Sequence, residues 1–235
     1  FEFEVIVVMD GAEEATRLVC AAAAARHSNF KAKWIPNDVY RNPSFARNIA
    51  SKMACGDILI HQSDDVLHGH PHVIRQLVEQ TTPQNFVIAT VWNADPATLA
   101  HLVQYTGQEN QRGLFFLGAV TRANYFACGG NCEEFDEPGW EDNWLEFSLT
   151  RGLRLQLVFS TDAVGLHLNH PRAPRDHFQT RMRALYVEKQ RIAESANDPR
   201  AWMQEPWPYQ AGRAMQEGST SAEASGCRSS SLHQP

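Results

Sequence analysis

The fold is indicated by a stretch in the first third of the chain, which reads Ala54-Cys55-Gly56-Asp57-Ile58-Leu59-Ile60-His61-Gln62-Ser63-Asp64-Asp65. Residues 57–61 are a short apolar run, which predicts a strand buried in a sheet. A glycine ends the helical pattern before the run, and a polar, acidic cluster follows it directly. Ligands of open α/β sheets bind beyond the carboxyl ends of the strands, so this cluster is a candidate ligand site.

The same pattern extends to both sides of this stretch. The expected strands are 4–9, 31–35, 57–61 and 86–92, and the expected helices are 13–27, 43–55, 71–80 and one that begins at Asp95-Pro96. An aspartate followed by proline is typical of a helix N-cap and first turn. Strands that alternate with helices imply crossover connections, and therefore a mostly parallel sheet.

The alternation loosens after Gly113. The expected strands are then 114–120, 153–159 and 164–168, and the expected helices are 122–127, 141–151 and 175–194. We expect one domain over residues 1–196, with halves at 1–112 and 113–172 and a C-terminal helix at 173–196. Residues 197–235 are rich in Pro and Gln and then in Ser, Ala and Gly, a composition that predicts a disordered tail.

Bulk composition limits the function classes. The chain has 235 residues, 43% of them hydrophobic, and a formal net charge of -6. That negative charge argues against nucleic acid as a partner. For the same reason, binding of an anionic substrate would need a metal ion or a few arginines. Five cysteines without framework spacing indicate a reducing compartment, and we expect a cytoplasmic protein. No apolar run is long enough for a membrane span, and the strand-like start suggests missing upstream residues.

Two acidic sites fall at expected strand ends. Asp10 follows the strand 4–9, and Asp64 and Asp65 follow the strand 57–61. Adjacent carboxylates there can hold Mg²⁺ or Mn²⁺, which prefer oxygen ligands. A solvated turn that caps the helix 71–80 is the alternative, and the spacing leaves both open.

Two later segments could carry chemistry. Glu141-Asp142 begins an expected helix, where a carboxylate could accept a proton from a hydroxyl or could only cap the helix. His167 and His170 lie at a strand end, where they could bind metal or could simply face opposite sides of the strand. Three alternating histidines at 68, 70 and 72 are interpreted as surface residues.

Taken in order, six segments resemble family 2 glycosyltransferases of the GT-A fold, over roughly residues 1–172. The segments are Glu4–Gly11, Ala46-Arg47-Asn48 with Ala54–Leu59, Gln62–Val66, Leu117–Gly130 with Glu133 or Glu134, Glu141-Asp142, and His167 with His170. The resemblance implies an α/β fold with a GT-A-like, doubly wound, mostly parallel sheet flanked by helices. The family's first strand has no counterpart in the chain.

The resemblance also implies roles. Asp10, Arg47 and Asp64 would bind the nucleotide, and Asp64, Asp65, His167 and His170 would hold Mn²⁺ or Mg²⁺. Asp142 would be the catalytic base with Glu141 beside it, and Trp140 and Gly130 would contact the acceptor.

The implied activity is an inverting, metal-dependent transfer of sugar from a nucleotide-diphospho-sugar to a hydroxyl of a glycan, lipid or other acceptor. A non-catalytic module that binds a nucleotide or glycan is the main alternative. A metal-dependent nucleotidyltransferase would leave Glu141-Asp142 without a role.

Overall fold

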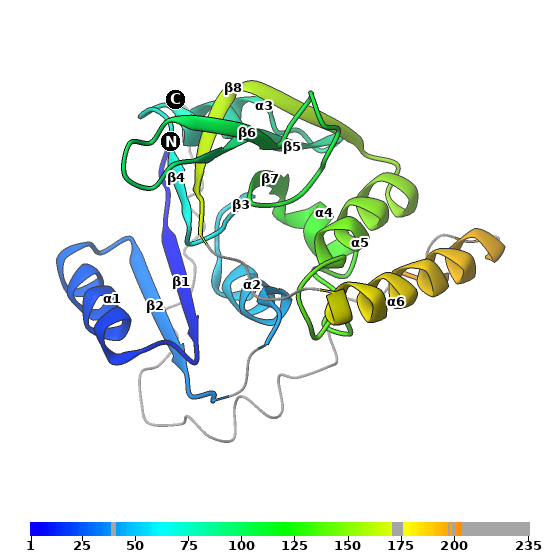
Figure 1. The fold of residues 1–235 in the computed structure, drawn as a ribbon, viewed down its shortest axis with the longest axis horizontal. Coiled ribbons are helices and arrows are strands. Elements are labelled where there is room, and N and C mark those ends of the chain that lie inside the picture. The colour runs from blue at the N-terminus through cyan, green and yellow to red at the C-terminus, as the bar shows by residue number, and fades with distance from the viewer. Residues whose placement is uncertain (39–40, 171–175, 197, 199–200, 204–235) are drawn as a thin grey trace, which may run out of the picture.

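The computed structural model describes residues 1–38, 41–170, 176–196, 198 and 201–203, with no side chains described for 176–179. Its elements up to the middle of the chain are β1 (Val5–Asp10), α1 (Glu14–Arg26), β2 (Phe30–Ile35), α2 (Pro43–Met53), β3 (Ile58–Gln62), β4 (Val66–His68), α3 (Val73–Gln80) and β5 (Asn85–Ala94). The later elements are β6 (His101–Thr106), β7 (Leu117–Thr121), α4 (Arg122–Ala127), α5 (Glu141–Phe147), a π-helical turn (Ser148–Gly152), β8 (Gln156–Leu168) and α6 (Asp176–Ser195) (Figure 1).

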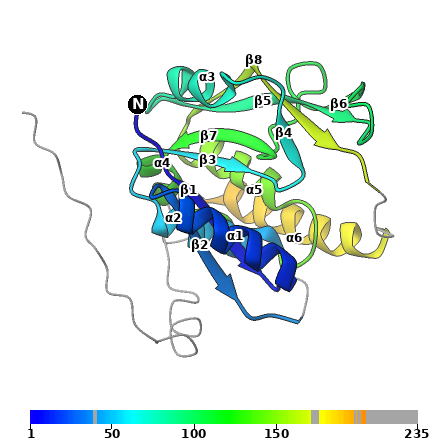
Figure 2. The ribbon, with the colours of Figure 1, turned by 90° about the vertical axis from the view of Figure 1, so that its left-hand side faces the viewer.

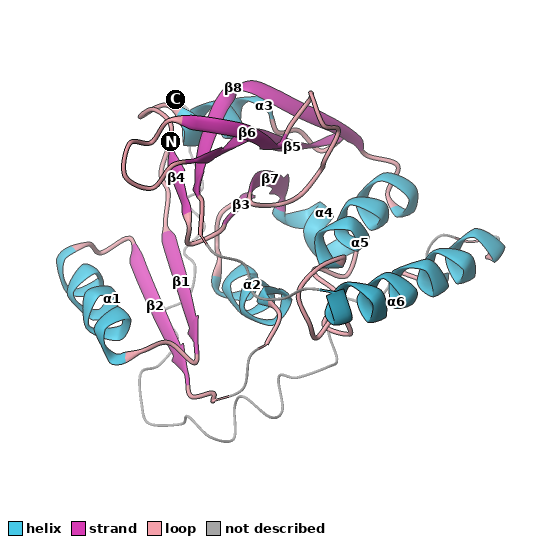
Figure 3. Cartoon of the chain, viewed as in Figure 1, coloured by secondary structure: helices cyan, strands magenta, loops and turns pink. Residues whose placement is uncertain are grey.

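The strands form two sheets. β1 and β2 pair in parallel as a two-stranded sheet, and the larger sheet has the order β3-β7-β5-β8-β4, with β6 paired to β5. Figure 3 shows the two sheets as separate groups of arrows. The α/β class is confirmed, but parallel pairing is less common than the alternation indicated. β5–β8 is parallel, whereas the described pairs β3–β7, β5–β7, β4–β8 and β5–β6 are antiparallel.

β5 is the centre of the larger sheet and separates two cores. Phe86 and Ile88 point to the side where Tyr125 of α4 and Leu145 of α5 pack. The alternate residues of β5, such as Val87, point to the opposite side and pack with α3. In Figure 2, α3 lies above this sheet and α4 and α5 lie below it. Period-two alternation with both faces buried explains why β5 is apolar along most of its length.

The smaller sheet is covered by α1 and α2, which pack against β2 and β1 respectively. α2 begins as its sequence predicts, because Asn42 accepts a hydrogen bond from the Ser44 N–H at 2.9 Å and Pro43 occupies the first turn. This cap fixes the start of a helix whose polar side is buried.

The prediction of a helix that begins at Asp95 is wrong. Asp95 instead caps a tight turn, because its Oδ1 accepts hydrogen bonds from the backbone of Ala97 and Thr98 at 3.0 and 2.8 Å. Such local bonds satisfy the backbone without a helix. The chain then returns as β6 beside β5, which explains one of the antiparallel pairs.

Three other boundaries differ from the sequence expectation. The helix expected over 141–151 ends at Phe147 and continues as the π-helical turn, and the two strands expected over 153–168 form one strand, β8, with a register shift. The short strand β4 was not expected. The long C-terminal helix is confirmed as α6.

A third cluster attaches α6 to the rest of the molecule. Met182 and Ala193 of α6 pack with Trp144 and Phe135. Trp202 belongs to the same cluster, with its ring 5.5 Å from that of Trp144. Most of the expected tail, residues 197, 199–200 and 204–235, lies outside the described residues. None of the described helices is both long and apolar enough to cross a bilayer.

Candidate active site

One carboxylate and two histidines meet at one edge of the larger sheet. β5 and β8 run in parallel and end together, with Asn93 opposite His167. β4 lies on the other side of β8, with Val66 opposite His167, so Asp65 is brought beside that histidine. The potential ligand atoms of Asp65, His167 and His170 all lie within 4.8 Å of one another. The structure thus brings together three of the four residues that the resemblance implies as metal ligands, and their binding of a metal stays a prediction.

The buried imidazole of His167 is held in one orientation. Its Nδ1 lies 2.7 Å from Oδ1 of Asn93, and because an amide oxygen can only accept, Nδ1 donates. The ring also stacks on Tyr105, with centroids 4.9 Å apart. In the neutral imidazole the remaining lone pair, on Nε2, then faces Asp65 Oδ2 at 3.0 Å.

Two acceptors at that separation repel each other unless a proton or a metal cation lies between them. Within the described residues, the other oxygen of Asp65, Oδ1, is buried and has no hydrogen-bond partner. Nε2 of His170 lies 3.3 Å from Asp65 Oδ2. One carboxylate and two imidazoles, one of them oriented by the Asn93 amide, are a donor set that suits Mn²⁺, and Asp65 provides the oxygen ligand that Mg²⁺ prefers.

The neighbouring candidates lie outside this group. Asp64 is exposed and is not among the clustered ligands. His68 bonds the Gln62 side chain, and His70 bonds the Asp162 carbonyl at 2.7 Å. Of the two adjacent aspartates that the sequence left as alternatives, the structure brings Asp65 to the histidines.

At the end of β1, Asp10 is paired with an arginine. Arg41 Nε lies 3.3 Å from Asp10 Oδ2, and the Arg41 guanidinium lies over the Phe45 ring. The second oxygen of Asp10 is buried and lacks a hydrogen-bond partner in the part of the chain that the structure describes. An unbonded acceptor beside a cation and an aromatic ring suits recognition of a polar heterocycle.

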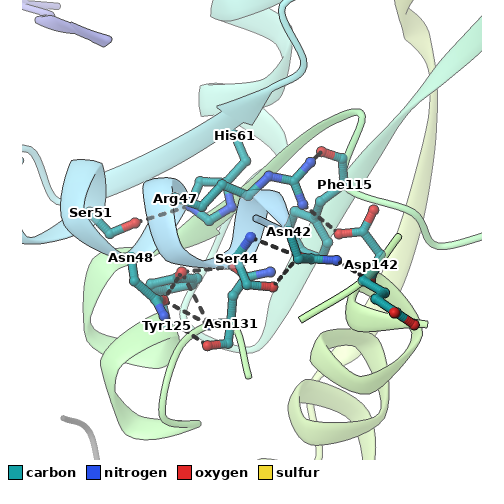
Figure 4. Close-up of polar contacts among 11 residues, drawn as sticks. Asn42, Ser44, Arg47, Asn48, Ser51, His61, Phe115, Tyr125, Asn131 and Asp142 are labelled. Atoms are coloured by element: carbon teal, nitrogen blue, oxygen red, sulfur yellow. Dashed lines mark hydrogen bonds and ion pairs between the residues drawn. The ribbon is translucent and has the colours of Figure 1, made fainter. Parts of the chain in front are cut away.

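The proposed base, Asp142, forms a buried ion pair with Arg47. Arg47 Nη1 lies 2.6 Å from Asp142 Oδ1, and Arg47 Nη2 donates to the Phe115 carbonyl at 3.1 Å. Figure 4 shows the guanidinium extended between these two partners. Burial works to lower the pKa of Arg47, but the charges of Asp142 and Glu141 outweigh it and raise that pKa. Arg47, which the resemblance places near the diphosphate, is thus paired with Asp142 in this structure, and its contact with a nucleotide stays a prediction.

Glu141 lies beside this pair and is also buried. Burial, and then the charge of Asp142, raises the pKa of Glu141 from 4.5 to about 7. Among the described atoms, its Oε2 is buried without a hydrogen-bond partner. A carboxyl group that holds its proton near neutral pH can donate or accept a proton there.

The raised pKa of Glu141 predicts how stability depends on pH. The folded state holds this proton more tightly than the unfolded state. The contribution of Glu141 to the free energy of unfolding is therefore lost as pH rises from about 4.5 to about 7. We expect Glu141→Gln to be more stable than the wild type at pH 8, by on the order of 2 kcal/mol. Urea denaturation of both proteins at pH 8 and pH 5 measures this difference, which should shrink at pH 5. A difference that is the same at both pH values would contradict the prediction.

Side chains on the polar side of α2 hydrogen-bond the loop before α5. Asn48 Nδ2 donates to the Asn131 carbonyl at 2.8 Å, and its Oδ1 accepts from the Asn131 N–H at 3.0 Å. Tyr125 OH donates to Asn48 Oδ1, and Asn42 Nδ2 donates to the Glu137 carbonyl, each at 2.8 Å. Figure 4 shows this network beside Arg47 and Asp142. It fixes the approach of the chain to Glu141.

The two residues expected to contact the acceptor, Gly130 and Trp140, each make contacts within the protein. Gly130 is buried at φ +67°, and a Cβ there would lie 2.7 Å from Asn48 Oδ1, so only glycine fits the network. Trp140 has a left-handed backbone at φ +72°, and its ring centroid lies 5.1 Å from that of Tyr186. Their contact with an acceptor stays a prediction.

No protein-family model matches the sequence, and no curated protein matches it. Solved structures do resemble it. The mannosyltransferase PcManGT from Pyrobaculum calidifontis, in complex with GDP-Man and Mn²⁺, matches with a TM-score of 0.54 at 15% identity. GalNAc-T7 with UDP, GalNAc and Mn²⁺ gives 0.56 at 11%, and TarS from S. aureus with UDP gives 0.56 at 14%.

The chain has the GT-A glycosyltransferase fold. Each match covers 86% of this chain, but the chain spans only 58%, 47% and 59% of the three structures in the order given. The resemblance seen in the short ordered motifs is therefore confirmed at the level of the fold.

In this GT-A chain, sequence reasoning missed the residues that hold the candidate ligands in place. Asn93 fixes the His167 ring and Arg41 pairs with Asp10, yet neither was a candidate. The signal for Asn93 was a polar residue near the end of an apolar strand, which marks the ligand edge of an α/β sheet. Arg41 had no comparable signal, because it lies in a loop.

Proposed function

We propose that this chain is the catalytic domain of a metal-dependent glycosyltransferase that moves a sugar from a nucleotide-diphospho-sugar to an acceptor hydroxyl with inversion. The observation that carries the proposal is the clustering of Asp65, His167 and His170 at the ligand edge of a GT-A sheet. PcManGT contains GDP-Man and Mn²⁺, and GalNAc-T7 contains UDP, GalNAc and Mn²⁺, and both support this donor class.

The donor would be held from two sides. Asp65, His167 and His170 would hold the metal ion, which when bound supplies positive charge for the diphosphate leaving group. Asp10 with Arg41 would recognise the nucleoside, because a buried unbonded carboxylate oxygen can accept hydrogen bonds from a base or ribose. Asp64 is exposed and would contribute little to either task.

Asp142 would act as the base. It would accept the proton of the acceptor hydroxyl, whose oxygen attacks the anomeric carbon from the face opposite the diphosphate. The bond from that carbon to the diphosphate oxygen breaks, and the diphosphate leaves with the electron pair. A single displacement of this kind inverts the anomeric configuration.

Arg47 and Glu141 would support the base. The ion pair at 2.6 Å holds the side chain of Asp142 in position. Glu141 would then receive or return the proton locally, since its pKa is raised to about 7 by burial and by Asp142. Both residues act within the same buried cluster as the base.

Donor hydrolysis in the absence of acceptor tests the proposal. We expect the chain to release nucleoside diphosphate from GDP- or UDP-sugars with Mn²⁺ and to stop when EDTA is added. Nucleotide-sugar binding without any turnover, with donor alone or with acceptor hydroxyls supplied, would instead support the alternative of a binding module. A pyrophosphate-bonded product would indicate a nucleotidyltransferase.

A further inference from the structure

A cleft between α5 and α6 is not used by the proposed reaction. It has a volume of about 560 Å³ and is lined chiefly by Asn143, Glu146, Phe147, Tyr186, Gln190 and Glu194. The first three come from α5 and the last three from α6, which lie side by side in both views of the ribbon (Figures 1 and 2). The loop before β7 adds Gln111 at the rim.

Helical spacing places these side chains on facing surfaces. Asn143, Glu146 and Phe147 share one face of α5, and residues 186, 190 and 194 are each four apart on α6. Gln190 Nε2 donates to Tyr186 OH at 2.9 Å, which fixes two of the lining groups. The π-helical turn at Ser148–Gly152 directly follows the α5 wall, and π-turns are common beside functional sites.

Glu146 is held at the wall of this cleft. The backbone of Gly113 hydrogen-bonds its carboxyl group, and burial raises the pKa of Glu146. A Cβ at Gly113 would lie 2.6 Å from Glu146 Oε2, so the glycine allows the carboxyl group to approach the backbone this closely. The carboxyl group is therefore placed by the fold rather than extended freely into solvent.

The chemistry of the lining selects the class of ligand. It contains two carboxyl groups, Glu146 and Glu194, and one cation, Arg151, so its charge is unsuited to a nucleotide diphosphate. Amide and phenol groups can both donate and accept hydrogen bonds, as sugar hydroxyls do. Phe147 and Tyr186 add only a small apolar part to the lining, because both rings also pack against tryptophans.

We propose that this cleft binds a neutral oligosaccharide, as the extension of the acceptor whose terminal hydroxyl reacts near Asp142. The role of this oligosaccharide as an acceptor rests on the proposed function, whereas its binding in the cleft does not. Asn143 directly follows Glu141-Asp142, and α5 rises about 6 Å between residues 142 and 146. The reacting carboxylate and the cleft are thus joined by one turn of one helix.

Direct binding to the full chain without donor or metal tests the cleft. The probes are gluco-, manno-, chito- and xylo-oligosaccharides of one to six units, and the readout is intrinsic fluorescence, since Trp140 and Trp144 lie against Tyr186. We expect at least one series to bind more tightly as its length increases. Glu146→Gln and Gln190→Ala should each weaken that binding about tenfold, the loss of one good hydrogen bond.

Glu188→Gln is the matched control. It removes the same charge as Glu146→Gln, but Glu188 lies exposed on α6, where it pairs with Arg191. The inference is overturned if no oligosaccharide binds the wild type, or if Glu188→Gln weakens binding as much as the cleft variants. Thermal unfolding of each variant shows whether it is folded, and Gln190→Ala serves if Glu146→Gln is not.

Donor hydrolysis with Mn²⁺ separates this inference from the proposed function. Hydrolysis of the nucleotide-sugar without oligosaccharide binding would contradict the cleft proposal and support the proposed transferase. Length-dependent oligosaccharide binding without Mn²⁺-dependent turnover of any nucleotide-sugar would remove the transferase and leave a glycan-binding cleft.

Discussion

Asp142→Asn is expected to lower the rate of sugar transfer about 10²- to 10⁴-fold, the usual contribution of a general base. The amide keeps an oxygen that can accept the hydrogen bond from Arg47, so the side chain should stay in place while losing its basicity. Donor affinity should change little, because the proposed metal ligands and Asp10 are other residues. Steady-state transfer rates and titration with UDP or GDP in Mn²⁺ measure the two effects separately.

The free energy of unfolding of Asp142→Asn must be measured as well. The substitution leaves Arg47, whose side chain is only 13% exposed, without its opposite charge. Breaking a buried ion pair costs about 3–5 kcal/mol, and the retained hydrogen bond should reduce this cost. Asp136→Asn is the control, since Asp136 is exposed in the preceding loop and pairs with Arg181 at the surface. Normal turnover by Asp142→Asn would remove Asp142 from the role of base.

Asp65→Asn is expected to weaken Mn²⁺ binding by at least about 100-fold. Changes to groups that merely orient a ligand cost 10- to 100-fold, and Asp65 is the carboxylate that faces both His167 and His170. Titration of Mn²⁺ followed by electron paramagnetic resonance measures the affinity directly. Donor hydrolysis should fall in parallel.

The adjacent residue provides a strict control for this prediction. Asp64→Asn makes the same chemical change one position away, at an exposed side chain outside the cluster. Its Mn²⁺ affinity should stay within a few-fold of the wild type, as expected for a surface charge. Equal losses in both variants would mean that Mn²⁺ responds to the net charge of the loop rather than to the clustered ligands.

Asn93→Ala should show a smaller loss, about 10- to 100-fold, because it frees the His167 ring without removing a ligand. The loss of Mn²⁺ affinity should therefore be largest for Asp65→Asn, intermediate for Asn93→Ala and smallest for Asp64→Asn.

The sequence was most informative where a pattern repeats. β5 follows from an apolar run and α6 from a long helical pattern, because burial imposes a periodic pattern on the residues, whereas β8 was expected as two strands. Asp65, His167 and His170 could be suggested separately from their places at strand ends. Their convergence could not be derived from periodicity, because it depends on β4 pairing with β8, and β4 is only three residues long.

The turn at Asp95 shows the opposite case. Aspartate followed by proline is equally suited to a helix start and to a tight turn, and the choice depends on whether later residues have a strand to pair with. β6 has such a partner in β5, so pairing determined the outcome. The ion pair of Arg47 with Asp142, which lie 95 residues apart, likewise depends on the tertiary arrangement that brings α2 to the start of α5.

The hydrogen bonds that α2 makes to the loop before α5 have a consequence for how far the sequence of this loop can vary. Asn48 and Asn42 bind that loop partly through its main-chain carbonyl groups, at Asn131 and Glu137. A backbone anchor does not depend on the side chains of residues between those two points. Substitutions at Glu134 or Asp136 should therefore leave Glu141 and Asp142 in their positions, so the sequence of this loop can vary while the proposed base stays in place.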